Sequence, residues 1–195
     1  MPTNYNMKQR TTQRIAKRVF INPQFKDRAI VLKNNEETNG VYLLGQLEVA
    51  PGGGNHLHTH SSFEETFIAV QGVLGIKYGG KDIYLNPGDT FTIPKKQPHA
   101  FFNNGEETII CQVKLSPGHE GFIKGIAILY GLAADGKTNK KGVPRSLTHL
   151  ALFFSLADTI PTGSLSLLAP LFRWLAARAR KRGVERELLE KYYYV

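Results

Sequence analysis

The sequence predicts an all-β domain followed by an α-helical C-terminal extension. Two patterns carry this prediction. In the first part of the chain, short apolar runs alternate with turn signals made of Gly, Asn and Pro, which is typical of an antiparallel sandwich or barrel. After Ser116-Pro117-Gly118, apolar residues recur at the spacing of a helix instead.

The composition fits a single globular domain. With 195 residues the chain is long enough to bury a substantial core, and 42% hydrophobic residues exclude wholesale disorder. Its one cysteine, Cys111, allows no intramolecular disulfide and is expected to be a small core residue. No apolar segment follows the basic N-terminus, and no run is long enough to span a membrane. We therefore expect a cytoplasmic protein without a signal peptide or transmembrane segment.

The formal net charge is +9 at pH 7, and three clusters account for much of it. The clusters are Lys8, Arg10, Arg14, Lys17 and Arg18; Lys137, Lys140, Lys141 and Arg145; and Arg173, Arg178, Arg180, Lys181, Arg182 and Arg186. Attraction to nucleic acid, anionic lipid or an anionic small substrate is one interpretation. No recognition motif accompanies the charge, so solvated surface is favoured and no specific nucleic-acid partner is expected.

The first strands are expected over residues 18–21, 28–32 and 41–49. Asn39-Gly40 between the last two is a strong hairpin signal. Further strands are expected over residues 66–70, 73–78, 81–85, 90–93, 99–103 and 108–115. Glycine-containing turns separate most of these runs.

Four helices are expected in the extension. The first carries apolar residues from Phe122 to Tyr130, and the second and third cover residues 147–157 and 164–182. A last short helix carries Val184, Leu188 and Leu189. The middle two are more apolar than an exposed appendage should be. They could pack on the outside of the β domain, form a subunit interface or act as a lid. A helix lying in a membrane surface is a further alternative for 164–182, where apolar and arginine faces coexist.

The most informative stretch is a row of histidines. His56, His58 and His60 alternate, which places their imidazoles on one face of an extended chain. Such a face is a poor hydrophobic core but a good start to a metal site, because neutral imidazole suits Fe, Ni, Cu and Zn. Glu65 can converge with His60 only if the chain turns between them, and the intervening Ser-Ser pair is plausible turn chemistry.

A second segment, residues 88–99, reads as a turn, a short strand and a proline-bounded loop that ends in a histidine. The two segments together resemble the two motifs of the cupin superfamily. The first motif is matched by Gly52, His58, His60, Glu65 and Gly72, and the second by Gly88, Pro94, His99 and Asn103. Lys96 stands where the family usually has glycine, a position that shapes the loop and is not a ligand.

This resemblance implies a jelly-roll barrel (double-stranded β-helix) over residues 27–116. An N-terminal arm over 1–26 would precede the barrel, and a helical extension over 117–195 would pack on it or at a dimer interface. Homodimers are common in the family. The resemblance also implies a divalent transition metal, Fe, Ni, Mn or Zn, with the expected ligands His58, His60, Glu65 and His99.

Around this site the sequence predicts a mostly apolar pocket. The candidates for the pocket or its surroundings are His56, Phe67, Phe91, Phe101 and Asn103. An apolar pocket beside an open metal position favours an aromatic or other weakly polar small molecule. Two functions stay open at this point: a metal-dependent, dioxygenase-like enzyme, for which isomerase chemistry is a variant, and a non-catalytic small-molecule-binding, sensor or structural module.

Overall fold

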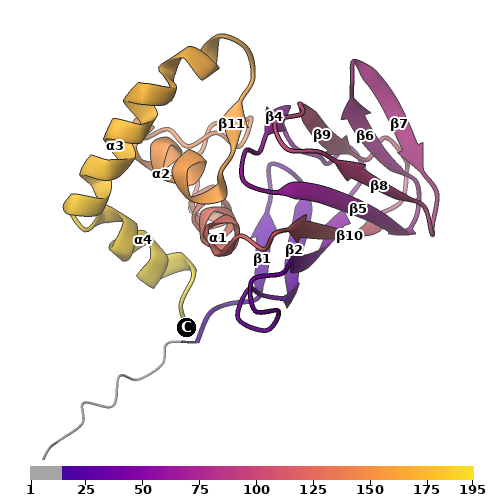
Figure 1. Cartoon of the computed structure of the whole chain (residues 1–195), viewed down its shortest axis with the longest axis horizontal. Coiled ribbons are helices and arrows are strands. Elements are labelled where there is room, and N and C mark those ends of the chain that lie inside the picture. Colours follow the sequence, from indigo (N-terminus) through magenta and orange to yellow (C-terminus); the bar gives the residue numbers. More distant parts are fainter. Residues whose placement is uncertain (1–14) are drawn as a thin grey trace, which may run out of the picture.

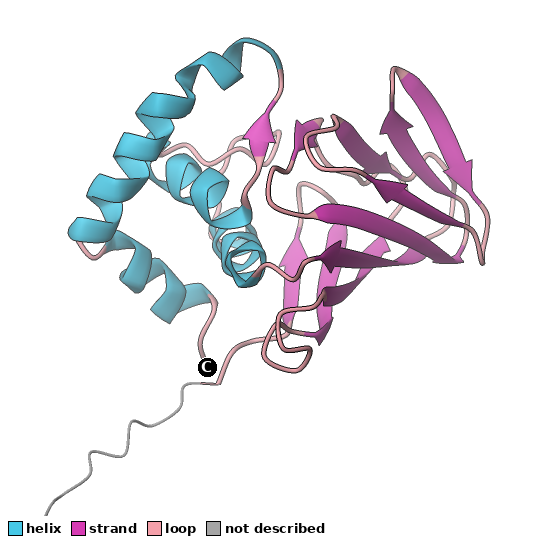
Figure 2. Cartoon of the chain, viewed as in Figure 1, coloured by secondary structure: helices cyan, strands magenta, loops and turns pink. Residues whose placement is uncertain are grey.

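The computed structural model describes residues 15–195, except the side chains of residues 164 and 165. Most of the predicted N-terminal arm, including Lys8, Arg10 and Arg14, lies outside the described residues. Figure 1 shows two β-sheets on one side of the molecule and the helices α1 to α4 gathered on the other. The same division is visible by element type in Figure 2.

Within residues 15–195 the strands form two antiparallel sheets. The larger has the order β1 (Val19–Asn22), β2 (Asp27–Lys33), β3 (Leu43–Val49), β10 (Ile109–Ser116), β5 (Glu64–Gln71), β8 (Thr90–Ile93). The smaller has the order β11 (Ile160–Pro161), β4 (His58–Thr59), β9 (His99–Phe102), β6 (Leu74–Tyr78), β7 (Lys81–Leu85). All predicted strands are confirmed, including β1 inside the predicted arm. The two-residue strands β4 and β11 were not predicted.

The expected barrel is not closed by hydrogen bonds: among the described residues, no named strand of one sheet pairs with a named strand of the other. Two of the edge strands are short: β8 of the larger sheet has four residues and β11 of the smaller sheet has two. Pro94 and Pro98 flank the loop before β9 and cannot donate backbone hydrogen bonds. The fold is therefore a two-sheet jelly roll.

The helical extension comprises α1 (Glu120–Ala134), α2 (Leu147–Ala157), the 3₁₀ helix η1 (Gly163–Leu168), α3 (Ala169–Lys181) and α4 (Val184–Tyr192). His119 and Ser146 cap the first two helices by accepting backbone hydrogen bonds. The predicted third helix is divided into η1 and α3, because Pro170 favours the first turn of a new helix.

The helices and sheets share one hydrophobic core. Buried residues of α1, such as Ile123 and Leu129, belong to the same cluster as Phe20 of β1 and Val113 of β10. Helix α1 packs on β1, α2 and α4 pack on α1, and α3 packs on α2, which accounts for the inner faces of the helices. Cys111 is fully buried in β10 as expected, and burial raises the pKa of its thiol to about 12.

Candidate metal centre and adjoining cavity

Four side chains from three strands and one turn meet at a single point. His58 lies in β4 directly opposite His99 of β9, His60 follows β4, and Glu65 lies in β5. Each offers one ligand atom, and the four atoms lie within 4.8 Å of one another. The structure thus brings together the four residues that the sequence predicts as ligands.

The turn between His60 and Glu65 is held by a residue of the helical extension. Asp158 ends α2 in a left-handed conformation with φ of 47°. Its carboxylate accepts hydrogen bonds from the backbone N–H and the hydroxyl of both Ser61 and Ser62, at 2.6 to 2.7 Å. Sequence analysis missed Asp158, because no local pattern links it to a turn almost a hundred residues earlier.

Backbone carbonyls set the orientation of all three imidazoles. The Nδ1 atoms of His58, His60 and His99 lie 2.8, 3.0 and 2.9 Å from the carbonyl oxygens of His56, Asp158 and Gln97. A carbonyl can only accept, so each Nδ1 carries the proton. The Nε2 lone pairs of neutral rings then point inward, which is the arrangement that metal-ligating histidines adopt.

The Nε2 atoms of the histidines lie too close together for their lone pairs to be accommodated without a cation or a proton. Nε2 of His58 lies 3.0 Å from Nε2 of His60, and two lone pairs at that distance need a cation or proton between them. Nε2 of His99 lies 2.7 Å from Oε2 of Glu65. The donor set therefore fits a divalent transition metal, which prefers imidazole nitrogen together with a carboxylate.

Burial and hydrogen bonding set the charges in this site. Burial lowers the pKa of His58 to about 3 and also lowers the pKa of His60, so both rings are neutral at pH 7. Burial alone would raise the pKa of Glu65, but the hydrogen bond with His99 and the neighbouring imidazoles hold it at about 2. Burial would lower the pKa of His99, but the hydrogen bond to Glu65 raises it. Because Nδ1 of His99 already carries a proton, its Nε2 donates to Glu65 only when the ring is protonated on both nitrogens, and a metal would take the place of that second proton. Neutral imidazoles beside an ionised carboxylate are the protonation states that metal binding requires.

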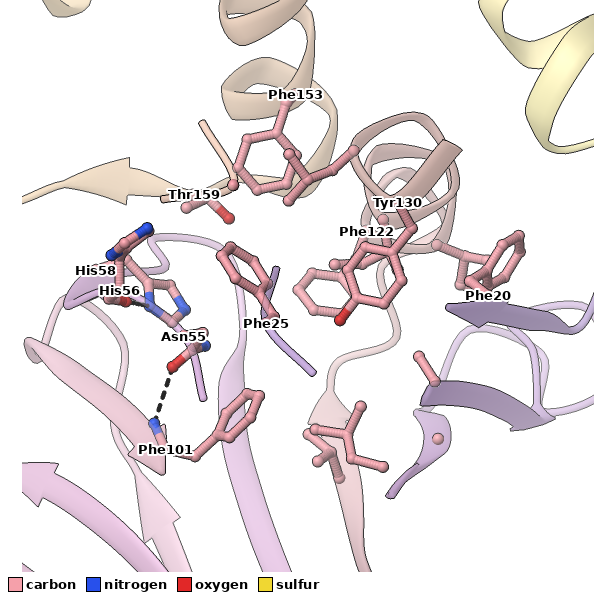
Figure 3. Close-up of a pocket in the computed structure, with 18 of the residues that line it drawn as sticks. Phe20, Phe25, Asn55, His56, His58, Phe101, Phe122, Tyr130, Phe153 and Thr159 are labelled. Carbon is pink, nitrogen blue, oxygen red and sulfur yellow. Dashed lines mark hydrogen bonds between the residues drawn. The ribbon is translucent and has the colours of Figure 1, made fainter. Parts of the chain in front are cut away.

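A cavity of about 390 Å³ adjoins this site. Its walls come from β2, β3 and β10 on one side and from α1, α2 and residues 141–144 on the other. In Figure 3, Phe25, Phe122 and Phe153 lie between the histidines at one end and Tyr130 at the other. His58 and Glu65 border the cavity, so a ligand inside it can reach the candidate metal centre.

Of the five predicted pocket residues, two line this cavity. Phe101 forms part of the wall. His56 also lines it, and its Nε2 lies 2.6 Å from the carbonyl oxygen of Lys141, in the segment that covers one side.

The other three lie elsewhere. Phe67 is buried behind the wall, with its ring 6.2 Å from that of Phe101. Phe91 packs edge-on against Tyr78. The amide of Asn103 donates hydrogen bonds to the carbonyl oxygens of Val49 and Glu107. Its side chain therefore stabilises a loop and does not face the cavity. Strand parity gives the face of a residue but not whether another ring lies in front of it.

The helical half of the cavity wall was not predicted residue by residue. Phe122, Tyr130, Phe153 and Phe154 contribute to it from α1 and α2. The unusual apolarity of these helices was the available signal, but it did not distinguish a cavity wall from a subunit interface.

The fold and the site together define a two-sheet jelly roll with a cluster of three histidines and one glutamate. Residues 45–113 match the model of the cupin domain family. The matched segment is therefore similar to a cupin domain, in agreement with the resemblance that the two motifs carry.

One curated relative is germin-like protein 4-1 of Oryza sativa subsp. japonica, which is 29% identical over 109 residues. The match covers 49% of this chain and 43% of that protein, so the chain spans less than half the length of this relative.

Solved structures that are similar to part of the chain include a predicted oxalate decarboxylase from Thermotoga maritima. It has 18% identity and a TM-score of 0.46, and the match covers 55% of this chain and 96% of that one. KdgF from Halomonas sp. has 17% identity and a TM-score of 0.43, with 49% of this chain and 83% of that chain covered.

Proposed function

We propose that this protein is a metal-binding cupin that takes a small, largely apolar organic molecule into the cavity beside the metal. The observation that carries the proposal is the convergence of three Nε2 atoms and Glu65 at the cavity wall. Each imidazole is fixed from behind by a backbone carbonyl. Metal ligands are held in a fixed orientation in this way, whereas histidines with a purely structural role would not need all three rings to point at one place.

His58, His60, Glu65 and His99 would hold the metal, which we take to be Fe, Ni, Mn or Zn. A bound metal with an open position supplies Lewis-acid chemistry or, in the case of iron, dioxygen chemistry. The rest of the site binds and orients the organic molecule. Aromatic walls exclude water, and His58 and Glu65 mark the end of the cavity where the reacting part of the molecule would lie.

Within this proposal we favour a dioxygenase-like activity on an aromatic or other weakly polar compound. An isomerase would use the same site with a different metal. A non-catalytic sensor is supported by a different observation, namely that α1 and α2 line the cavity directly. A molecule bound in the cavity would then contact α1 and α2 and could change the conformation of the helical extension.

The test is metal content followed by turnover. Protein purified from its own host is analysed for metals, then loaded with iron and offered phenolic compounds while dioxygen is measured. His99→Ala should lose both metal and activity, whereas His56→Ala, a histidine of the same row outside the cluster, should keep the metal. Full activity of metal-free protein would contradict the proposal, and metal binding without any turnover would favour the sensor.

Two further expectations stay predictions. The homodimer implied by the family is measured by sedimentation of the purified protein, and the cytoplasmic location by fractionation of the host cell. Among the described residues, no helix is both long and apolar enough to cross a bilayer.

A further inference from the structure

Helix α3 carries apolar side chains on its solvent face as well as on its core face. Phe172, Ala176 and Ala179 are buried, and α3 packs against α2. The outward side chains of η1 and α3 are Leu167, Leu168, Leu171 and Trp174, which are 80%, 44%, 45% and 57% exposed. Core packing explains the buried side chains of α3. It does not explain the exposed apolar ones, which have no packing partner among the described residues.

These outward residues form one continuous stripe. Leu171, Trp174 and Arg178 follow one another at intervals of three and four residues, so they are neighbours on the helix surface. The guanidinium of Arg178 lies 5.6 Å from the ring centre of Trp174. An aromatic ring beside an arginine combines an apolar body with a charged end, a pairing that suits the boundary between hydrocarbon and water.

The charge around the stripe has one sign. Residues 163–182 contain no Asp or Glu, and their cations are Arg173, Arg178, Arg180, Lys181 and Arg182. Among the residues that the structure describes, Arg180 is the one of these cations that forms an ion pair, with Glu185 of α4. This excess disfavours a second copy of the same face as the occupant, because like charges would meet across a two-fold axis. It favours an anionic surface.

The position of the stripe allows it to reach a flat surface. In Figure 1, α3 forms the outer edge of the helical layer, on the side away from the sheets. Its 13 residues rise about 1.5 Å each, which is too short to cross a hydrocarbon core of about 30 Å. Pro161 and Thr162, which line the cavity, directly precede η1.

We propose that the outer face of η1 and α3 docks the protein on an anionic phospholipid surface. Leu167, Leu168, Leu171 and Trp174 enter the interface, and the surrounding arginines and lysine bind the lipid phosphates. The helix lies along the surface and does not span it. This docking is independent of the metal and would place an apolar cavity close to a source of apolar molecules.

The chain contains one tryptophan, so its fluorescence reports on this face directly. Protein is titrated with vesicles of phosphatidylcholine alone or mixed with phosphatidylglycerol. We expect a blue shift and co-sedimentation with the mixed vesicles, weaker with phosphatidylcholine and reduced by salt. Leu171→Glu should weaken binding at least about tenfold, and Arg178→Gln about fivefold. Val41→Glu, at a more exposed apolar position between β2 and β3, should leave binding unchanged.

Two results would overturn the proposal. The first is unchanged Trp174 emission and no co-sedimentation at any content of anionic lipid. The second is a blue shift that appears without vesicles, grows with protein concentration, accompanies a dimer in sedimentation and disappears in Leu171→Glu. That result would make this face an interface between copies. Circular dichroism and thermal melting establish that each exposed-site variant is folded before it is compared.

Discussion

The carbonyl oxygen of Asp158 lies 3.0 Å from Nδ1 of His60, so the helical extension orients one of the proposed metal ligands. The carboxylate of the same residue holds Ser61 and Ser62 in the turn that brings His60 and Glu65 together. Strand β11, two residues further on, pairs with the strand that carries His58. The extension is therefore part of the site and not an appendage to it.

Asp158→Ala removes the carboxylate while leaving the backbone carbonyl that faces His60. We expect metal affinity to fall about 10- to 100-fold, since supporting residues around metal ligands have effects of that size. Stability should fall by about 2–4 kcal/mol, because several hydrogen bonds to a charged group are lost. Metal affinity is measured by competition with a chelator and stability by denaturant unfolding.

Asp158→Asn is the matched control for this prediction. Asparagine tolerates the left-handed conformation at φ of 47° and keeps one acceptor for the serines. It should therefore lie between the wild type and Asp158→Ala in both measurements. Equal metal affinity in all three proteins would mean that the turn needs no support from the extension.

Metal binding should stabilise the fold, because the ligands come from separate strands that only folding brings together. A metal present at about 100 times its dissociation constant adds about 2.7 kcal/mol, which is roughly 5–10 °C in melting temperature for a chain of this size. Thermal melting with and without a chelator measures the shift. Glu65→Gln should abolish most of it and His56→Ala should not; an equal shift in Glu65→Gln would place the metal elsewhere.

A buried carboxyl group outside the metal site should make stability depend on pH. Asp27 accepts a hydrogen bond of 2.6 Å from the hydroxyl of Tyr130, and among the described residues its Oδ1 has no partner. Burial raises the pKa of Asp27 to about 7. Between pH 4 and 7 the unfolded chain has released this proton and the folded protein has not, so the Asp27 contribution lowers stability as pH rises.

Asp27→Asn removes this ionisation and keeps an acceptor for Tyr130. We expect the variant to gain stability relative to the wild type as pH rises from 4 to 8, by at most about 4 kcal/mol. Denaturant unfolding at fixed pH values gives the difference in unfolding free energy between the variant and the wild type. Contributions from other titrating groups are the same in both proteins and cancel in this difference. Tyr130→Phe removes the hydroxyl that lowers this pKa and should be more destabilising at pH 8 than at pH 5. A difference that is flat with pH would contradict the assignment to Asp27.

Local patterns predicted the strands, because these depend on short-range geometry, and the resemblance to the two cupin motifs supplied the ligand set. The alternation of His58 and His60 fixes their common face, and the serines between His60 and Glu65 indicate a turn, which the structure places between the two sheets. Asp158, Tyr130 and Phe153 could not be found in this way. Their roles depend on how the helices pack on the larger sheet, which is set by contacts between residues far apart in sequence.

The cavity can be tested without knowing its natural ligand. Gly45 lies in the middle of β3 and lines the cavity, and a Cβ at this position would meet nothing closer than 3.4 Å. Gly45→Ala and Gly45→Leu should therefore fold and reduce the space in steps. A fluorescent apolar probe such as N-phenyl-1-naphthylamine should bind progressively more weakly along this series, by about tenfold or more for leucine.

Metal affinity should stay constant, since Gly45 contacts none of the four proposed ligands. Equal probe binding in all three proteins would show that apolar molecules bind at another place, and a parallel loss of metal would show that the substitution had disturbed the site itself.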